Sequence, residues 1–265
     1  MSIHTVDFYG LKVSVFTEKE LEQELLNTIS SINSEVYYGY SMAVLLYLKK
    51  YPEYYQTTNS FDVMVTDGRI FYLLANFFGF KLKLNISIPQ LTLKALGMAN
   101  DNGFKVMLIG GSKESNMAAC HFLTKKYPGI ALCPGRDGYF SEEDHSEVFN
   151  LLKENKPQLL LIGMPTPQKQ LLAAKIRDIL KGCIIIPCGG MIDVLSGKEK
   201  LTPYWIKKLG LASLYRHVQY PSRLSELFYI YFLTLKAVII CIFLKYIKRT
   251  DNICIPEIIV KSKHS

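Results

Sequence analysis

Residues 183–197, CIIIPCGGMIDVLSG, constrain the fold more than any other stretch of this chain. Their three consecutive isoleucines form a short apolar run, which is typical of a strand covered on both faces of a parallel sheet. Gly189 and Gly190 follow and permit a sharp turn or a close ligand contact, because glycine has no Cβ. Asp193 lies at the start of the apolar-periodic segment that comes next. The stretch therefore predicts a strand, a glycine turn and a helix.

Two further stretches show the same order of a strand, a glycine exit and a helix. The segment KVMLIGG predicts a strand that ends at Gly110 and Gly111, with Ser112 as the N-cap of the next helix. The segment QLLLIG predicts a third strand that ends at Gly163. Such units indicate right-handed parallel connections, and ligands collect at the carboxyl ends of parallel strands. We therefore expect an α/β fold, a Rossmann-like parallel sheet flanked by helices, whose loops converge on one binding site.

The composition limits the possible partners. The chain has 265 residues, 49% of them hydrophobic, so it can bury a sizeable core. Its net charge of +8 suggests an anionic partner, which nucleic acid, an acidic membrane surface and a diphosphate would all satisfy. The six cysteines form no CxxC pair, which favours reduced thiols in a cytoplasmic protein. The first residues lack the basic and apolar regions of an export signal.

The amino-terminal third contains several local signals. Residues 5–15 predict a strand or hairpin around Gly10, and Thr17 with Glu20 forms a capping box for a helix over residues 17–32. Residues 36–51 are rich in tyrosine and predict a helix. Their aromatic rings are expected in a core or interface, with a stacking platform as the alternative.

Asp67 ends the segment DVMVTDG, which predicts a strand followed by a helix over residues 70–79. It is either a turn or cap aspartate or a general base at the rim of the ligand crevice, and the residues alone leave both open. Residues 80–92 alternate like an edge strand that Pro89 cuts short.

The segment PGRDGYF predicts a loop. In it Arg136 could pair with phosphate and Tyr139 could stack on a base, although an ordinary surface turn explains both residues equally simply. The acidic residues 141–144 only weakly resemble a metal-binding cluster. We expect them to begin a solvated helix, with Ser141 as the N-cap.

The tail differs in composition. Residues 227–244 are apolar apart from Lys236, and their 18 residues reach the lower bound for a membrane span. The central lysine and the cytosolic character of the rest of the chain favour a segment that lies in one leaflet of the membrane. A core helix of a soluble dimer is the alternative. Basic residues that would attract anionic headgroups flank it, namely Arg216, Arg223, Lys245, Lys248 and Arg249.

These stretches together resemble the WecG/TagA/CpsF glycosyltransferases, glycosyltransferase family 26, over roughly residues 62–224. The shared segments are TDG, LIGGS, KKYPG, GYF, LLLIGMPTPQ, CGGMIDVLSGK and LTPYWIKKLGLASLYRHVQYPSRL. The last is the most specific, because it combines a proline, the only tryptophan, a Leu-Gly-Leu and a Tyr-Arg pair at the family's spacing.

The resemblance implies transfer of a sugar from a UDP-sugar to undecaprenyl-diphosphate-linked GlcNAc at the cytoplasmic face of the bacterial inner membrane. It implies a catalytic domain over residues 1–217 and a membrane-associating tail over residues 218–265, peripheral or inserted, in a possible homo-oligomer. Asp67 matches the base that deprotonates the acceptor hydroxyl. The residues implied to bind the donor are Gly110, Gly111, Ser112, Tyr139, Gly163, Gly189, Gly190 and Asp193. Those implied to bind the diphosphate or acceptor are Lys83, Arg216 and Arg223.

The chain departs from the family pattern at three places. Residues 38–40 (YGY) replace Thr-x-Asn, residues 83–88 (KLNISI) replace Arg-x-x-Gly-x-Asp, and residues 168–170 (QKQ) replace Lys-Gln-Glu. These changes favour a hexose donor such as galactose or glucose in O-antigen, lipopolysaccharide or capsule synthesis. The alternative is a UDP-N-acetylmannosamine-type transferase for teichoic-acid linkage or enterobacterial common antigen.

We expect direct inverting displacement without a resident metal, because the chain has no Asp-x-Asp motif. Mn²⁺ or Mg²⁺ stays possible through residues 142–144. Two rival functions are less consistent with the residues. An NAD oxidoreductase would need G-x-G-x-x-G, which neither glycine pair completes. A non-catalytic binding protein for membrane surfaces or nucleic acid is disfavoured, because the basic residues gather around one apolar tail rather than interleave with exposed aromatic residues along a recognition element. We therefore expect no nucleic-acid partner.

Overall fold

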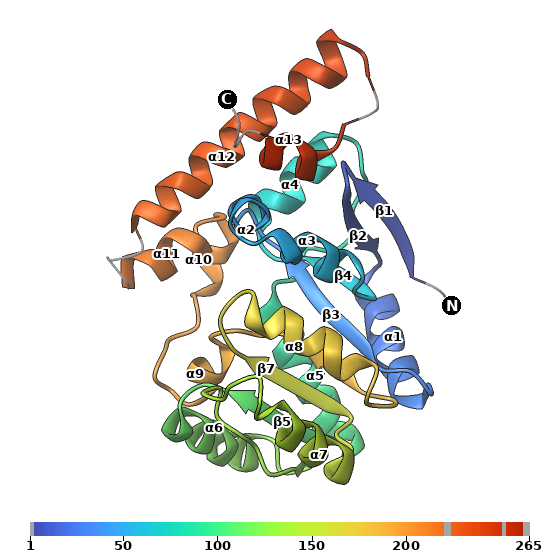
Figure 1. Ribbon diagram of the computed structural model, residues 1–265, viewed down its shortest axis with the longest axis vertical. Helices are drawn as coiled ribbons and strands as arrows, with labels where there is room; N and C mark the ends of the chain where they lie inside the picture. Colours follow the sequence, from blue (N-terminus) through green and yellow to red (C-terminus); the bar gives the residue numbers. More distant parts are fainter. Residues whose placement is uncertain (1–2, 220–223, 251–252, 262–265) are drawn as a thin grey trace.

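The computed structural model of the protein describes residues 3–219, 224–250 and 253–261. Within these ranges the chain forms a six-stranded parallel sheet with the order β4-β3-β8-β7-β5-β6, and a separate two-stranded antiparallel hairpin. Helices cover both faces of the parallel sheet (Figure 1). The predicted α/β fold with a flanked parallel sheet is confirmed.

The strands are β1 (His4–Phe8), β2 (Leu11–Val15), β3 (Glu35–Tyr40), β4 (Val63–Thr66), β5 (Lys105–Gly110), β6 (Ala131–Leu132), β7 (Leu159–Gly163) and β8 (Ile184–Ile186). The helices of the sheet layers are α1 (Glu18–Ser30), α2 (Val44–Lys50), α3 (Pro52–Asn59), α4 (Arg69–Phe77), α5 (Ile88–Asn102), α6 (Lys113–Lys126), α7 (His145–Asn155), α8 (Gln168–Arg177) and α9 (Met191–Leu195). The carboxy-terminal elements are α10 (Tyr204–Lys208), α11 (Ala212–Gln219), α12 (Leu224–Ile242), the π-helical turn η2 (Phe243–Ile247) and α13 (Ile255–Lys261).

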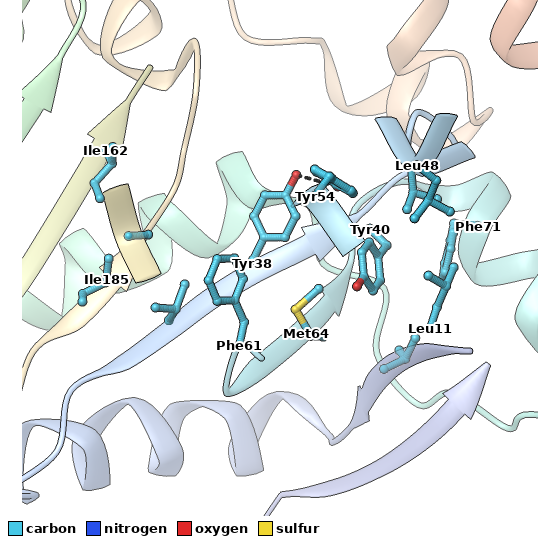
Figure 2. Close-up of a cluster of buried hydrophobic side chains, with 14 of the residues drawn as sticks. Leu11, Tyr38, Tyr40, Leu48, Tyr54, Phe61, Met64, Phe71, Ile162 and Ile185 are labelled. Carbon is cyan, nitrogen blue, oxygen red and sulfur yellow. Dashed lines mark hydrogen bonds between the residues drawn. The ribbon is translucent and has the colours of Figure 1, made fainter. Parts of the chain in front are cut away.

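The strands alternate between two apolar cores because successive side chains point to opposite faces of the sheet. One core includes buried residues of α2, α3, α4, α7, α8 and α12, and the other includes those of α1, α5, α6 and α9. In β3, Tyr38 and Tyr40 belong to the first core and Tyr37 belongs to the second. Figure 2 shows Tyr38 and Tyr40 beside Phe61 and Met64, with the Tyr38 hydroxyl bonded to that of Tyr54.

Several local predictions are confirmed. The hairpin β1–β2 turns at Gly10, whose φ of 89° lies in the region that glycine tolerates. Thr17 and Glu20 form the capping box of α1, and Ser112 caps α6 by accepting from the Ser115 backbone N–H. The three strands that carry glycine exits are adjacent in the order β8-β7-β5. Their carboxyl ends therefore share one edge of the sheet.

Three element predictions are wrong. Residues 36–40 form strand β3, and only residues 44–50 are helical, because a run of tyrosines suits a doubly covered strand as well as a helix. Residues 80–87 contain no strand, and α5 begins at Ile88. Ser87 and Gln90 form a capping box there, and Pro89 occupies the first turn. The helix after the acidic segment begins at His145, because the carboxylate of Asp144 accepts bonds from Ser141 and closes a turn first.

The carboxy-terminal elements pack on the amino-terminal half of the sheet. Helix α12 contacts α2 and lies across the top of the molecule, far from α6 and α7 (Figure 1). Its inner face buries Leu227, Ile230, Leu233, Ala237 and Cys241. The segment Leu224–Ile247 is long and apolar enough to cross a membrane by length and composition, but a third of its most apolar 18 residues are buried against the protein. The boundary predicted between residues 217 and 218 falls inside α11.

Candidate functional site

A cavity of about 390 Å³ opens at the carboxyl edge of the sheet, beside the ends of β3, β4 and β8. Its floor includes Tyr38 and Gly39 of β3, Asp67 after β4, and the Gly189–Gly190 turn after β8. The opposite wall comes from α10, α11 and the first turns of α12. The carboxy-terminal appendage therefore completes a cavity that the sheet begins.

Asp67 is held in place by two neighbouring strands and a helix. Its backbone N–H donates to the Tyr40 carbonyl at 2.9 Å, and its Oδ1 accepts from the Ile88 N–H at 3.2 Å, at the first turn of α5. Gly39 lies directly beside it, since a Cβ there would stand 2.8 Å from the Asp67 Cβ. Within the described residues, its Oδ2 accepts no hydrogen bond. The geometry provides an oriented carboxylate at the cavity surface.

The Gly189–Gly190 turn lies in the same cavity as Asp67. Gly189 has a φ of 57°, and the Nζ of Lys169 lies 3.3 Å from the position that a Cβ on this residue would take. The preceding thiol of Cys188 also lines the cavity. Burial raises its pKa to about 12, while the nearby Lys169 ammonium acts in the opposite direction. The cysteine is therefore a neutral wall residue at physiological pH.

The remaining glycines of the predicted site do not line the described cavity. The Gly111 N–H donates to the Gly163 carbonyl at 2.9 Å, and a Cβ on Gly110 would stand 2.3 Å from that same oxygen. Gly163 in turn abuts Ile192 of α9. These glycines allow the loops after β5 and β7 to touch one another, so their small size has a packing reason in addition to any ligand contact.

This contact lies at the topological switch point of the sheet. The chain leaves β5 over one face through α6 to reach β6, and it leaves β7 over the other face through α8 to reach β8. Ligands of open α/β sheets bind where neighbouring connections diverge in this way. Helix α9 contacts α6 and begins beside the cavity, so it connects the switch point to the cavity.

Ser112, Tyr139 and Asp193 are each next in sequence to a residue of the switch point. Ser112 follows Gly111, Tyr139 follows Gly138, whose N–H donates to the Gly111 carbonyl at 2.9 Å, and Asp193 follows Ile192, which abuts Gly111 and Gly163. Tyr139 is 83% exposed, and its backbone N–H donates to Asp137. The Oδ1 of Asp193 is buried without a hydrogen bond in the described residues, 3.8 Å from the Nζ of Lys198. None of the three lines the cavity that holds Asp67. The sequence-predicted residues therefore form two neighbouring groups, one around Asp67 and one around Tyr139 and Asp193.

Other predicted cations lie elsewhere or outside the description. Lys83 is exposed and does not line the cavity, and its charge acts on the Glu20 carboxylate. Arg136 pairs with Glu147 at 2.6 Å and covers the Phe140 ring, so a structural role accounts for it. Arg216 lies on α11, but its side chain is outside the described residues, as is the whole of Arg223. The diphosphate or acceptor roles of Lys83, Arg216 and Arg223 stay predictions.

Residues 142–144 do not converge on a metal site. Glu142 lies 3.7 Å from Lys175, and Asp144 bonds to Ser141. In the part of the chain that the structure describes, no three His, Cys, Asp or Glu side chains form a group that could hold a metal ion. Metal dependence stays a prediction.

Tyr38, Asn85 and Lys169 line the cavity, although they are not among the predicted site residues; each belongs to a segment in which the chain departs from the family pattern. Tyr38 accepts from the buried Gln170 Nε2 at 2.8 Å, and burial raises its pKa above the ordinary value, so the phenol is neutral. The Oδ1 of Asn85 is buried without a hydrogen bond in the described residues. Lys169 follows a strand with a glycine exit. Its place just after a carboxyl end was the available signal.

The fold and the cavity define an α/β protein that binds its ligand across the carboxyl ends of a parallel sheet. The chain belongs to the WecG/TagA/CpsF glycosyl transferase family, whose model matches residues 6–252, and it is therefore a glycosyltransferase. It is 23% identical over 226 residues to the N-acetylglucosaminyldiphosphoundecaprenol N-acetyl-beta-D-mannosaminyltransferase of Bacillus subtilis (strain 168), covering 84% of each chain. It is 26% identical over 186 residues to the protein of the same name from Staphylococcus aureus (strain MW2), covering 69% of this chain and 72% of the relative.

Proposed function

We propose that the protein transfers a sugar from a UDP-sugar to an undecaprenyl-diphosphate-linked GlcNAc acceptor. The observation that carries this proposal is the presence of Asp67 and the Gly189–Gly190 turn in one cavity at the carboxyl edge of the sheet. A carboxylate suits the role of general base, and a glycine turn admits close approach of phosphate oxygens. The names of the two bacterial relatives supply the acceptor class.

The strand order supports a particular orientation of the donor. Along the edge, Asp67 follows β4, Gly39 lies in β3, Gly189 follows β8 and Ser112 follows β5, with β7 between the last two strands. Neighbouring strands lie about 4.8 Å apart, so the four intervals from β4 to β5 cover about 19 Å. A nucleotide sugar extended along this edge would place its sugar near β3, its diphosphate near β8 and its nucleoside at the switch point. The exposed ring of Tyr139 and the unbonded Oδ1 of Asp193 would then face the nucleoside.

The proposed reaction is a direct displacement with inversion. Asp67 accepts the proton of the acceptor hydroxyl, the acceptor oxygen forms a bond to the anomeric carbon, and the bond from that carbon to the β-phosphate oxygen breaks to release UDP. The Ile88 N–H keeps the carboxylate pointing into the cavity. General-base assistance of this kind contributes about 10²- to 10⁴-fold to the rate.

Two donor classes have separate support. The names of the relatives favour UDP-N-acetylmannosamine. The pair formed by Tyr38 and Gln170 supports a hexose such as galactose, because the Tyr38 hydroxyl is already engaged with Gln170 and Tyr54 within the protein. A hydroxyl that is paired in this way contributes no hydrogen bond that would select an acetamido group.

We further propose that α12 lies in the plane of the cytoplasmic membrane surface rather than across the bilayer. Its inner face is buried against the protein, whereas Phe228, Phe232, Leu235, Ile239 and Phe243 are exposed. Their spacing of three or four residues puts them on one side of the helix. The cavity reaches the first turn of α12 at Glu226 and Leu227. A lipid-linked acceptor would therefore enter beside the membrane-facing helix.

A product assay tests the proposal. The purified protein would be given UDP-N-acetylmannosamine, UDP-N-acetylglucosamine, UDP-galactose and UDP-glucose with a synthetic GlcNAc-diphosphate-lipid, and products would be identified by mass spectrometry. Transfer from one of these donors, with inverted anomeric configuration by NMR, is expected. A protein that transferred none of them, and bound no UDP, would contradict the proposed function.

A further inference from the structure

Lys169 is the cation that lies against the glycine turn of the cavity. Its Nζ is 3.3 Å from the position of a Cβ on Gly189, so the ammonium covers the face of the turn that a side chain would otherwise block. The residue lines the cavity together with Asp67. A ligand that approached the Gly189 backbone closely would meet this ammonium first.

The start of α8 fixes the direction of Lys169. The next residue, Gln170, is fully buried, and its Nε2 donates to the Tyr38 hydroxyl at 2.8 Å and to Thr166 Oγ1 at 3.3 Å. Successive residues of a helix point about 100° apart, given 3.6 residues per turn. Because Gln170 is bonded to the core, Lys169 is directed toward the cavity rather than along the outer face of the helix.

Side chains of opposite charge lie beside the two glycines of the turn. The Oε2 of Glu199 lies 3.6 Å from the position of a Cβ on Gly190, whereas Lys169 lies on the side of Gly189. The other cavity cations come from α4, α10 and the segment after α9, namely Arg69, Lys207 and Lys200. An anionic group is therefore favoured on the Lys169 side of the turn, toward Gly189.

We propose that Lys169 binds the diphosphate of the donor and offsets the charge that develops on the departing nucleotide. This inference rests on the proposed function and assigns the phosphate contact to a residue that follows β7. An ammonium is a compact cation with three donors, which suits contact with a terminal phosphate. Lys169 would then distinguish a nucleoside diphosphate from a monophosphate, since the added β-phosphate lies within its reach.

Calorimetric titration of the full-length protein with UDP, UMP and uridine tests this assignment. The variant Lys169→Met keeps most of the apolar stem and removes the charge, and Lys169→Arg keeps the charge. The matched control is Lys175→Met, because Lys175 lies on the same helix in a half-exposed contact with Glu142, which contributes little to stability.

The expected result for Lys169→Met is a loss of UDP affinity of about ten- to a hundredfold, the range for a hydrogen bond to a charged group. UMP and uridine affinities should change by less than about twofold, so the preference for UDP over UMP collapses. Lys169→Arg should recover part of the loss, and Lys175→Met should match the wild type. The salt dependence of UDP binding should also become weaker in Lys169→Met.

Equal UDP affinity in the wild type and Lys169→Met, or an equal loss for UDP, UMP and uridine, would overturn the assignment while the proposed function stands. A wild-type protein that bound no UDP would remove both together. Thermal unfolding of each variant separates a loss of binding from a loss of fold.

Discussion

Replacing Gly39 by alanine tests whether strand β3 positions Asp67. The new Cβ would stand 2.8 Å from the Asp67 Cβ, 3.0 Å from Val65 Cγ2 and 3.2 Å from Ile88 Cδ1. Ordinary van der Waals contact begins near 3.4 Å, so the tightest contact is short by 0.6 Å. The partner atom is bonded directly to the backbone and cannot rotate away, and therefore the aspartate must move with its strand.

The expected cost is about 1–3 kcal/mol of unfolding free energy, as for other overpacked sites. A misplacement approaching 1 Å can lower turnover by about a hundredfold, so we expect a loss of roughly ten- to a hundredfold in kcat. UDP affinity should be nearly unchanged, because the Gly189 turn belongs to another strand. Turnover with the synthetic acceptor, urea unfolding and UDP titration together measure these three quantities.

The control is Gly97→Ala in α5, where the new Cβ meets no atom within 4 Å. Alanine favours a helix by about 0.5–1 kcal/mol over glycine, so this variant should be slightly more stable and fully active. If Gly39→Ala behaved like Gly97→Ala in both turnover and stability, the claim that β3 positions the aspartate would be refuted.

Two further predictions concern pH and the membrane. Burial raises the pKa of Glu35, so the native state binds its proton more tightly than the unfolded chain and stability falls as pH rises above the ordinary value of 4.5. In urea unfolding, the stability of Glu35→Gln relative to the wild type should therefore be higher at pH 7 than at pH 4. A variant that was less stable than the wild type at pH 7 and not at pH 4 would contradict this. Phe232→Glu with Ile239→Glu, at side chains 60% and 56% exposed, should weaken binding to phosphatidylglycerol vesicles by at least about tenfold. Ile32→Glu, at an exposed site outside α12, should bind vesicles normally, and equal loss in both would exclude α12 as the docking face.

The order of strands, turns and helices could be predicted where local signals agree. The Gly189–Gly190 turn follows a run of isoleucines, and Asp67 follows a short apolar strand. Parallel topology then brings both to one edge of the sheet, and the structure places them in one cavity. Capping residues such as Thr17 and Ser112 also marked helix starts correctly.

The remainder depends on tertiary contacts that local patterns do not encode. The tyrosines of β3 satisfy both a helical and a strand pattern, and only burial on both faces decides between them. The alternation in residues 80–87 suggested a strand, although the Ser87–Gln90 capping box was a readable signal for α5. Lys83 and Lys169 are both lysines in loop or helix-start segments, and only the fold brings the second one to the glycine turn.

The most direct measurement is the turnover of Asp67→Asn together with its UDP affinity. Asparagine keeps a side-chain oxygen that can accept from the Ile88 N–H, so the cavity should remain intact while the base is lost. We expect kcat to fall by at least about a hundredfold with UDP affinity unchanged within about twofold. Wild-type turnover in Asp67→Asn would contradict the assignment of this carboxylate as the group that accepts the acceptor's proton.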